Sequence, residues 1–212
     1  MVQTFIEAHG TYKFFQKLFG NTRKSTYRYT EDILEKYNSL IEYKYIHNNS
    51  KRLNQIGTEK SISLMKGLKL GDTINQVRSR FKVSPYVKMY SSKGVRRIIL
   101  LYKIKLGGQK VKVEAHFYKN QLFFSKCIFS NVSDTVCNEL TNHFGEKYGV
   151  SNLDFTHKNI VDASNECVKL TTGTEIAVSY IQLNNPFFER MQEKMAVNTN
   201  TVELTYATAL GV

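Results

Sequence analysis

Between Gly67 and Gly149, hydrophobic and polar residues follow a pattern that predicts a helix, four strands and a second helix. Asp72 or Thr73 caps the first helix, whose apolar positions recur at helical spacing up to residue 82. Four alternating runs follow, separated by short turns, which is typical of an antiparallel meander. The predicted strands are Tyr86–Tyr90, Val95–Leu106, Gln109–Tyr118 and Gln121–Ser130. The second predicted helix covers residues 133–145.

The pair Gly107-Gly108 predicts a two-residue hairpin loop, and such a loop fixes which residues lie opposite each other. The resulting register gathers apolar residues on one face, pairing Ile104 with Val111, Tyr102 with Val113, Leu100 with Ala115 and Ile98 with Phe117. The next turn, Lys119-Asn120, continues this face by pairing Phe117 with Leu122 and Ala115 with Phe124. A slip by one residue would mix the two faces, so the segregation supports both hairpins.

The second face of these strands is mixed, with cations toward Gly107-Gly108 and apolar residues toward the other end. The same register sets lysine against lysine, at Lys105–Lys110 and Lys103–Lys112. Like charges directly opposite each other destabilise a sheet by roughly 0.2–1 kcal/mol per pair. The apolar part carries Ile99, Leu101, Phe123 and Phe129. Either another element, such as the N-terminal helices, half covers this face, or the face is a binding surface.

Helical spacing also predicts helices over residues 3–19 and 30–46, with a polar connector at 47–52. Beyond residue 150 the pattern predicts strands at Phe155–Val161, Glu166–Thr172 and Glu175–Gln182, then a helix opened by Asn185-Pro186, and a terminal strand or docking segment at Thr201–Leu210. The predicted fold class is α+β, an antiparallel meander sheet packed on helices with a helical N-terminal extension. The predicted organisation is the extension (1–60), the α+β core module (61–183) and a C-terminal helix and tail (184–212).

Two short segments flank the central pattern: Gly67-Leu68-Lys69-Leu70-Gly71-Asp72 before the first helix, and Phe144-Gly145-Glu146-Lys147-Tyr148-Gly149 at the end of the second. With the order of elements, they resemble the small α+β modules of the β-lactamase-inhibitor-protein type and of the small outer-membrane-assembly lipoproteins, over about residues 64–183. The resemblance implies protein binding rather than catalysis, and it carries over no functional residue. The chain departs from those proteins by lacking an export signal and a disulfide pattern and by its N-terminal extension.

The chain carries a net charge of +12. Residues 67–150 hold 15 bases and 5 acids, whereas residues 151–212 hold 4 bases and 7 acids. The positive charge therefore concentrates in the central stretch, where it would attract nucleic acid, an anionic membrane or an acidic protein. A solvated lysine-rich surface is the plainer alternative.

The sequence offers little chemistry for catalysis or metal binding. There is no phosphate-binding glycine loop and no Gly-x-Ser-x-Gly elbow. Glu114 and His116 share a strand face, which is too few ligands for a metal site, and Cys127 paired with His116 or His143 is a weak nucleophile candidate. No catalytic residue, metal or cofactor is expected. The three cysteines, Cys127, Cys137 and Cys167, predict free thiols in a reducing compartment, with a Cys127–Cys167 or Cys137–Cys167 bridge left open.

The expected location is the cytoplasm, because neither a secretory signal nor an apolar run of about 20 residues is present. A mature exported protein that has lost its leader gives the same pattern. The aromatic face of residues 3–19, bordered by Lys13 and Lys17, could lie on a membrane surface, but docking on the protein's own core is the favoured interpretation.

The sequence thus predicts a non-enzymatic protein-binding or adaptor module whose protein partner contacts the mixed face. The alternative is a nucleic-acid or anionic-surface binder that uses the same lysines, since cations contact phosphates and rings stack on bases. The candidate binding residues are Arg97, Lys103, Lys105, Lys110, Lys112, His116, Tyr118 and Phe123. The oligomeric state is not predicted.

Overall fold

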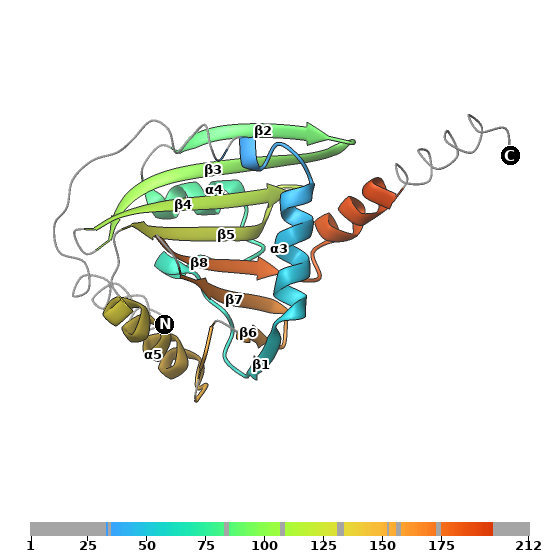
Figure 1. Cartoon of the computed structure of the whole chain (residues 1–212). Coiled ribbons are helices and arrows are strands. Elements are labelled where there is room, and N and C mark those ends of the chain that lie inside the picture. The colour runs from blue at the N-terminus through green and yellow to red at the C-terminus, as the bar shows by residue number, and fades with distance from the viewer. Residues whose placement is uncertain are drawn as a thin grey trace, which may run out of the picture.

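The computed structural model in Figure 1 describes residues 33, 35–82, 85–106, 109–130, 134–151, 153–155, 158–172 and 175–196. The helix predicted over residues 3–19, with its membrane alternative, and the tail predicted at Thr201–Leu210 lie outside these residues. The described chain is built on one twisted sheet with helices against both of its faces (Figure 1).

The sheet has eight strands in the order β1-β6-β7-β8-β5-β4-β3-β2. The strands are β1 Asn54–Thr58, β2 Tyr86–Ser92, β3 Val95–Leu106, β4 Gln109–Tyr118, β5 Gln121–Ser130, β6 Lys158–Asp162, β7 Glu166–Thr171 and β8 Glu175–Gln182. The meander β2–β5 and the hairpin β7–β8 are thus confirmed. They join through antiparallel pairing of β5 with β8, which hairpin signals alone do not reveal.

The α+β class is confirmed, but the expectation of a purely antiparallel sheet is wrong. β1 pairs in parallel with β6, so that Ile56 lies opposite Ile160, and the sheet is mixed. β1 has the sequence NQIGT and is exposed at three of its five positions. Such a strand has neither an apolar run nor an alternation from which the sequence could reveal it.

The register predicted from the first hairpin is confirmed. Ile104 lies opposite Val111, Tyr102 opposite Val113, Leu100 opposite Ala115 and Ile98 opposite Phe117. Phe117 also faces Leu122 across the second hairpin, as predicted.

Beyond that pair, the predicted register of the second hairpin is wrong by one residue. Ala115 faces Ser125, and Phe124 faces His116, because the register shifts beside His116 at a β-bulge. A shift of one residue moves the following side chains to the opposite face. Phe129, expected on the second face, accordingly lies in the core of the first.

Two helices cover the first face. α4, Ile74–Phe81, begins at a capping box formed by Thr73 and Gln76. Its buried Phe81 packs on Tyr102 of β3, with ring centroids 4.3 Å apart. α5, Asp134–Tyr148, adds the buried side chains Leu140, Phe144 and Tyr148 to the same core.

The second face is covered in part by α3, Ile41–Arg52, and by a C-terminal helix at residues 186–196. Figure 1 shows α3 crossing the near side of the sheet, with the C-terminal helix beside it. The predicted cap of the C-terminal helix is confirmed, since Asn185 Oδ1 accepts a hydrogen bond from the backbone amide of Phe187 at 3.0 Å. Phe187 stacks on Phe123 of β5, with ring centroids 4.2 Å apart.

The prediction of a polar connector at residues 47–52 is wrong, because these residues continue α3. His47 is buried there, 3.0 Å from the Leu183 carbonyl through Nε2 and stacked on Phe188 at 4.2 Å. The Ser50 carbonyl accepts a hydrogen bond from the side-chain amide of Asn159 (Nδ2) at 2.8 Å. These contacts with distant parts of the chain explain why a polar segment remains helical.

None of the three cysteines forms a disulfide. Cys127 belongs to the first-face core and Cys167 to the second-face core, so the sheet lies between them. Among the described residues, no helix combines the length and the apolar composition needed to cross a bilayer.

Candidate binding face of the sheet

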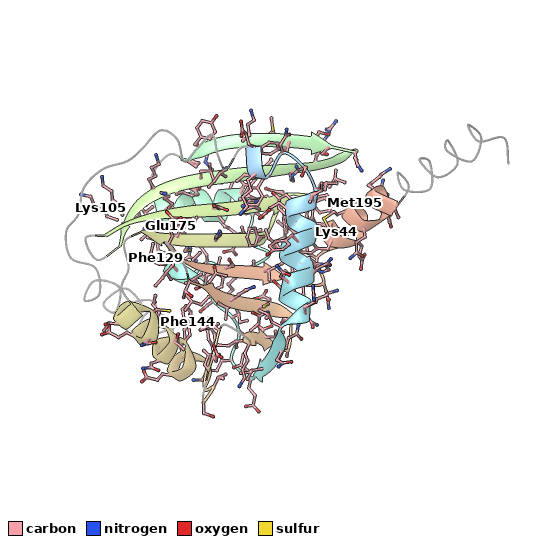
Figure 2. All side chains as sticks on the ribbon, viewed as in Figure 1. Lys44, Lys105, Phe129, Phe144, Glu175 and Met195 are labelled. Carbon is pink, nitrogen blue, oxygen red and sulfur yellow. The ribbon has the colours of Figure 1, made fainter. Side chains whose placement is uncertain are left out.

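Four lysines occupy the second face of the sheet at the end where β3 meets β4, and they are called the lysine cluster here. Lys105 lies opposite Lys110 and Lys103 lies opposite Lys112, in two consecutive same-face pairs. Lys103, Lys105 and Lys110 are exposed and Lys112 is half-buried. Figure 2 places Lys105 at the end of the sheet that α3 does not cover. The structure therefore confirms both predicted lysine pairs as cross-strand neighbours, and three of the four lysines are exposed.

Lys112 of the lysine cluster pairs with a glutamate on β8. Lys112 Nζ lies 3.3 Å from Glu175 Oε1, and the glutamate side chain is 40% exposed. A pair so open to solvent contributes little stability, about 0–1 kcal/mol. Partial burial lowers the pKa of Lys103, and the positive charges of Lys112 and Lys110 lower it further. The cluster therefore repels itself and presents a positive field to solvent.

The aromatic part of the expected binding face is covered. Arg97 is 1% exposed, His116 and Phe123 are fully buried, and Tyr118 is half-buried. These four candidate residues pack under α3 and the C-terminal helix, so the prediction that one continuous basic and aromatic surface contacts a partner does not hold. The other interpretation left open by the sequence, that a neighbouring element half covers this face, describes the structure.

Beneath α3, the aromatic part holds a buried polar network of Tyr37, Tyr43, Glu114 and His116. The Tyr37 hydroxyl donates to Glu114 Oε2 at 2.8 Å. The Tyr43 hydroxyl lies 2.8 Å from His116 Nδ1, and His116 Nε2 lies 3.4 Å from the same Glu114 oxygen. With the proton on Nε2, His116 donates to Glu114 and accepts from Tyr43, which gives every member a partner.

The protonation of this network follows from its burial. Burial lowers the pKa of His116, and the hydrogen bond and charge of Glu114 offset only part of that effect, so the ring is neutral at pH 7. Burial opposes ionisation of Glu114, but the contacts with His116, the charge of Lys126 and the bond from Tyr37 outweigh it and hold its pKa below the ordinary value. Fully enclosed by protein, the network joins α3 to the sheet rather than contacting a ligand.

Arg97 has the same structural role. Its guanidinium donates to the Tyr37 carbonyl at 2.6 Å and to the Asn38 carbonyl at 2.8 Å. It also lies over the Tyr43 ring at 5.3 Å and the Tyr90 ring at 5.1 Å from the centroids. The residue holds the turn that precedes α3 against β3.

A groove of about 140 Å³ runs beside α3 over β5, β8 and β7, and it is called the α3 groove here. Lys126, Ser179 and Lys169 form its floor and lie opposite one another on those three strands. α3 contributes Tyr45, Ile46 and Asn49 to one wall. The volume is below the roughly 300–1,000 Å³ of small-molecule sites, so the groove suits a single side chain or a small anion.

The sequence prediction omitted the residues of the α3 groove. Lys126 lies opposite Glu114 and could have been placed on the second face had the bulge been foreseen. Lys169 reaches the same surface only because β8 pairs with β5 and β7 with β8, which is a property of the whole sheet.

The described residues contain no group of three His, Cys, Asp or Glu side chains placed to hold a metal ion. Burial raises the pKa of the Cys127 thiol, with Glu114 adding to the rise, which disfavours the nucleophilic thiolate. Cys127 and His116 also belong to opposite faces of the sheet.

Comparison of the chain with protein-family models, with curated proteins and with solved structures gives no match.

Proposed function

We propose that this protein is a non-enzymatic binding module that recognises an acidic segment of a partner protein through the lysine cluster. The observation that carries the proposal is that two lysine pairs lie opposite each other on neighbouring strands, with three of the four lysines exposed. Each pair costs the sheet roughly 0.2–1 kcal/mol. Lysines that served only solubility could sit anywhere on the surface, whereas an anionic partner offsets the repulsion of opposed ones.

The covered rings favour a protein partner over nucleic acid. Single-strand binders combine a basic surface with aromatic side chains on which bases stack. The rings that would do so on this face, His116 and Phe123, are buried under helices. An acidic protein segment needs only the cations, so this coverage of the rings weakens the alternative of nucleic-acid binding.

The spacing of the lysine cluster suits an extended segment. Its two pairs lie two residues apart along the strands, which is about 6.6–6.8 Å. Alternate side chains of an extended peptide repeat at the same spacing. Acids at alternate positions of a partner segment can therefore meet both pairs.

The three cysteines without disulfides support a reducing compartment such as the cytoplasm. The Cys127 thiol with its raised pKa, and the enclosed His116–Glu114 pair, support a binding role without catalysis.

A binding titration tests the proposal. The probe is a short fluorescent peptide of alternating Glu and Thr, with a thymidine oligonucleotide of equal charge as competitor. The variant K105Q/K110Q removes one opposed pair, and K44Q/K51Q removes two exposed charges from α3 as the matched control. We expect K105Q/K110Q to weaken peptide binding by about 0.5–2 kcal/mol, from two exposed ion pairs of roughly 0.2–1 kcal/mol each. The control should bind like the wild type.

Two results would overturn the proposal. Equal losses in K105Q/K110Q and K44Q/K51Q would show that net charge, rather than the lysine cluster, attracts the peptide. Tighter binding of the oligonucleotide than of the peptide, with affinity falling steeply between low and moderate salt, would establish nucleic acid as the ligand.

A further inference from the structure

Two cations, Lys126 and Lys169, lie on the floor of the α3 groove. Within the described part of the chain, neither Lys126 nor Lys169 forms an ion pair. The acids whose charges act on Lys126 also have other partners: Glu114 binds Tyr37 and contacts His116, Glu42 pairs with Lys36 at 2.8 Å, and Glu175 pairs with Lys112. Buried or half-buried charges are normally paired, so these ammonium groups are available to an anion from outside.

The geometry allows both lysines to reach one anion. Adjacent strands lie about 4.8 Å apart, so the backbones at Lys126 and Lys169 are about 10 Å apart with Ser179 midway between them. All three side chains are half-buried and line the same groove. Two flexible ammonium groups and one hydroxyl can therefore donate to a single acceptor above Ser179.

We propose that the α3 groove binds a glutamate side chain of the partner's acidic segment, with its carboxylate between Lys126 and Lys169 and its methylenes against Tyr45 and Ile46. This inference rests on the proposed function, because it assigns a second contact to the same segment. Tyr45 is 63% exposed beside the groove, where it offers apolar area to an incoming side chain.

Charge and size support this occupant. Three lysines and a single glutamate line the groove, so its lining carries a net charge of +2. Burial lowers the pKa of Lys126, and the positive charge of Lys36 lowers it as well, while Glu114, Glu42 and Glu175 act in the opposite direction. A bound carboxylate would also raise this pKa, which favours the charged lysine. About 140 Å³ admits one side chain and excludes a nucleotide or a similar cofactor.

The α3 groove is continuous with the lysine cluster. Ile128 lies opposite Lys112 of the cluster, and Lys126 is the next same-face residue of β5. One extended segment can thus cross from the cluster to the groove, placing successive alternate acids on each.

The test uses the full chain, the alternating Glu–Thr peptide, and the variants K126Q/K169Q and S179A, with K44Q/K51Q as the charge-matched control. We expect K126Q/K169Q to weaken peptide binding about tenfold, as two partly buried ion pairs would give, and S179A about two- to fivefold, as one hydrogen bond would give. S179A keeps the charge and the strand, so it remains informative if the double variant folds poorly. Glutarate should compete with the peptide for the wild-type protein and lose potency against K126Q/K169Q.

Each outcome decides the assignment. Wild-type binding by K126Q/K169Q and S179A, together with a loss in K105Q/K110Q, would overturn the groove assignment and leave the proposed function standing. Wild-type binding by all three would overturn both. Displacement of the peptide by inorganic phosphate at lower concentration than by glutarate would show that the groove selects phosphate instead of a carboxylate.

Discussion

Replacing Arg97 with Met separates the two roles that its position on the mixed face allows. A partner-contacting arginine would be dispensable for folding. The structure instead buries it at 1% exposure between β3 and the turn before α3, where it donates to the carbonyls of Tyr37 and Asn38. Methionine keeps most of the aliphatic length and removes the guanidinium, and with it both of these hydrogen bonds.

The expected loss follows from those contacts. A hydrogen bond to a charged group contributes about 1.5–3 kcal/mol, so two of them give about 3–6 kcal/mol. Cation–π contacts with Tyr43 and Tyr90 add about 0.5–2 kcal/mol. Relief of the buried charge returns part of this total, and we expect a net destabilisation of about 3–5 kcal/mol. That is a large share of the roughly 5–15 kcal/mol that stabilises a typical domain.

The assay is urea unfolding followed by circular dichroism, with Arg96→Met as the control because Arg96 is the exposed neighbour on the same strand. The R97M midpoint should fall sharply, and its melting temperature by about 6–20 °C given about 2–4 °C per kcal/mol. The R96M midpoint should stay near the wild type. Equal midpoints for R97M and R96M would refute the placement of Arg97 beneath the turn.

Three further changes have defined outcomes. Lys105→Gln should raise the free energy of unfolding by about 0.2–1 kcal/mol, because it removes one member of a like-charge pair. A lower stability of this variant in urea would contradict the proposed repulsion between Lys105 and Lys110. Burial raises the pKa of Glu166 from 4.5 to about 7, and the charge of Asp162 adds to the rise. Between these two pH values, Glu166 is ionised in the unfolded chain but protonated in the folded chain, so the stability of the wild type falls as pH rises. Glu166→Gln should therefore gain in urea midpoint over the wild type at about pH 8 and little at about pH 5; a gain that is the same at both would contradict this sign. Gly145→Ala should lower the melting temperature despite the better helix propensity of alanine, because the added Cβ would lie 2.9 Å from the Val150 carbonyl oxygen. The control Asn142→Ala, at an exposed position of α5, should not lower it.

The sequence was informative where local signals determine local pairing. The Gly107-Gly108 turn and the alternation on either side of it were enough to predict the register of β3 with β4. The Asn185-Pro186 signal likewise located the start of the C-terminal helix. In both cases, the residues that define the element lie within a few positions of one another.

Features that depend on distant contacts could not be predicted in this way. The extension of α3 through His47 depends on Leu183 and Phe188, which are remote in sequence. β1 exists because β6 offers it an edge, and its own residues show no strand pattern. The β-bulge beside His116 is invisible to a period-two rule, which assumes uninterrupted alternation.

The same limitation affected the candidate site. A strand pattern assigns Lys103, Arg97 and His116 to one face, and the structure agrees in placing their strands in that register. Which part of that face is open depends on where α3 and the C-terminal helix lie. The lysines were therefore identified as surface residues, and the rings beside them were wrongly grouped with them.

The most direct test of whether the lysine cluster binds the partner is amine-reactive labelling of the full chain. The labelling is done with and without the alternating Glu–Thr peptide and is quantified by mass spectrometry. Lys103, Lys105 and Lys110 should become protected when the peptide is bound, while Lys51 and Lys60, exposed on other parts of the surface, should react at unchanged rates. Protection that falls on Lys51 or Lys60 instead, with Lys105 and Lys110 as reactive as in the free protein, would contradict the account.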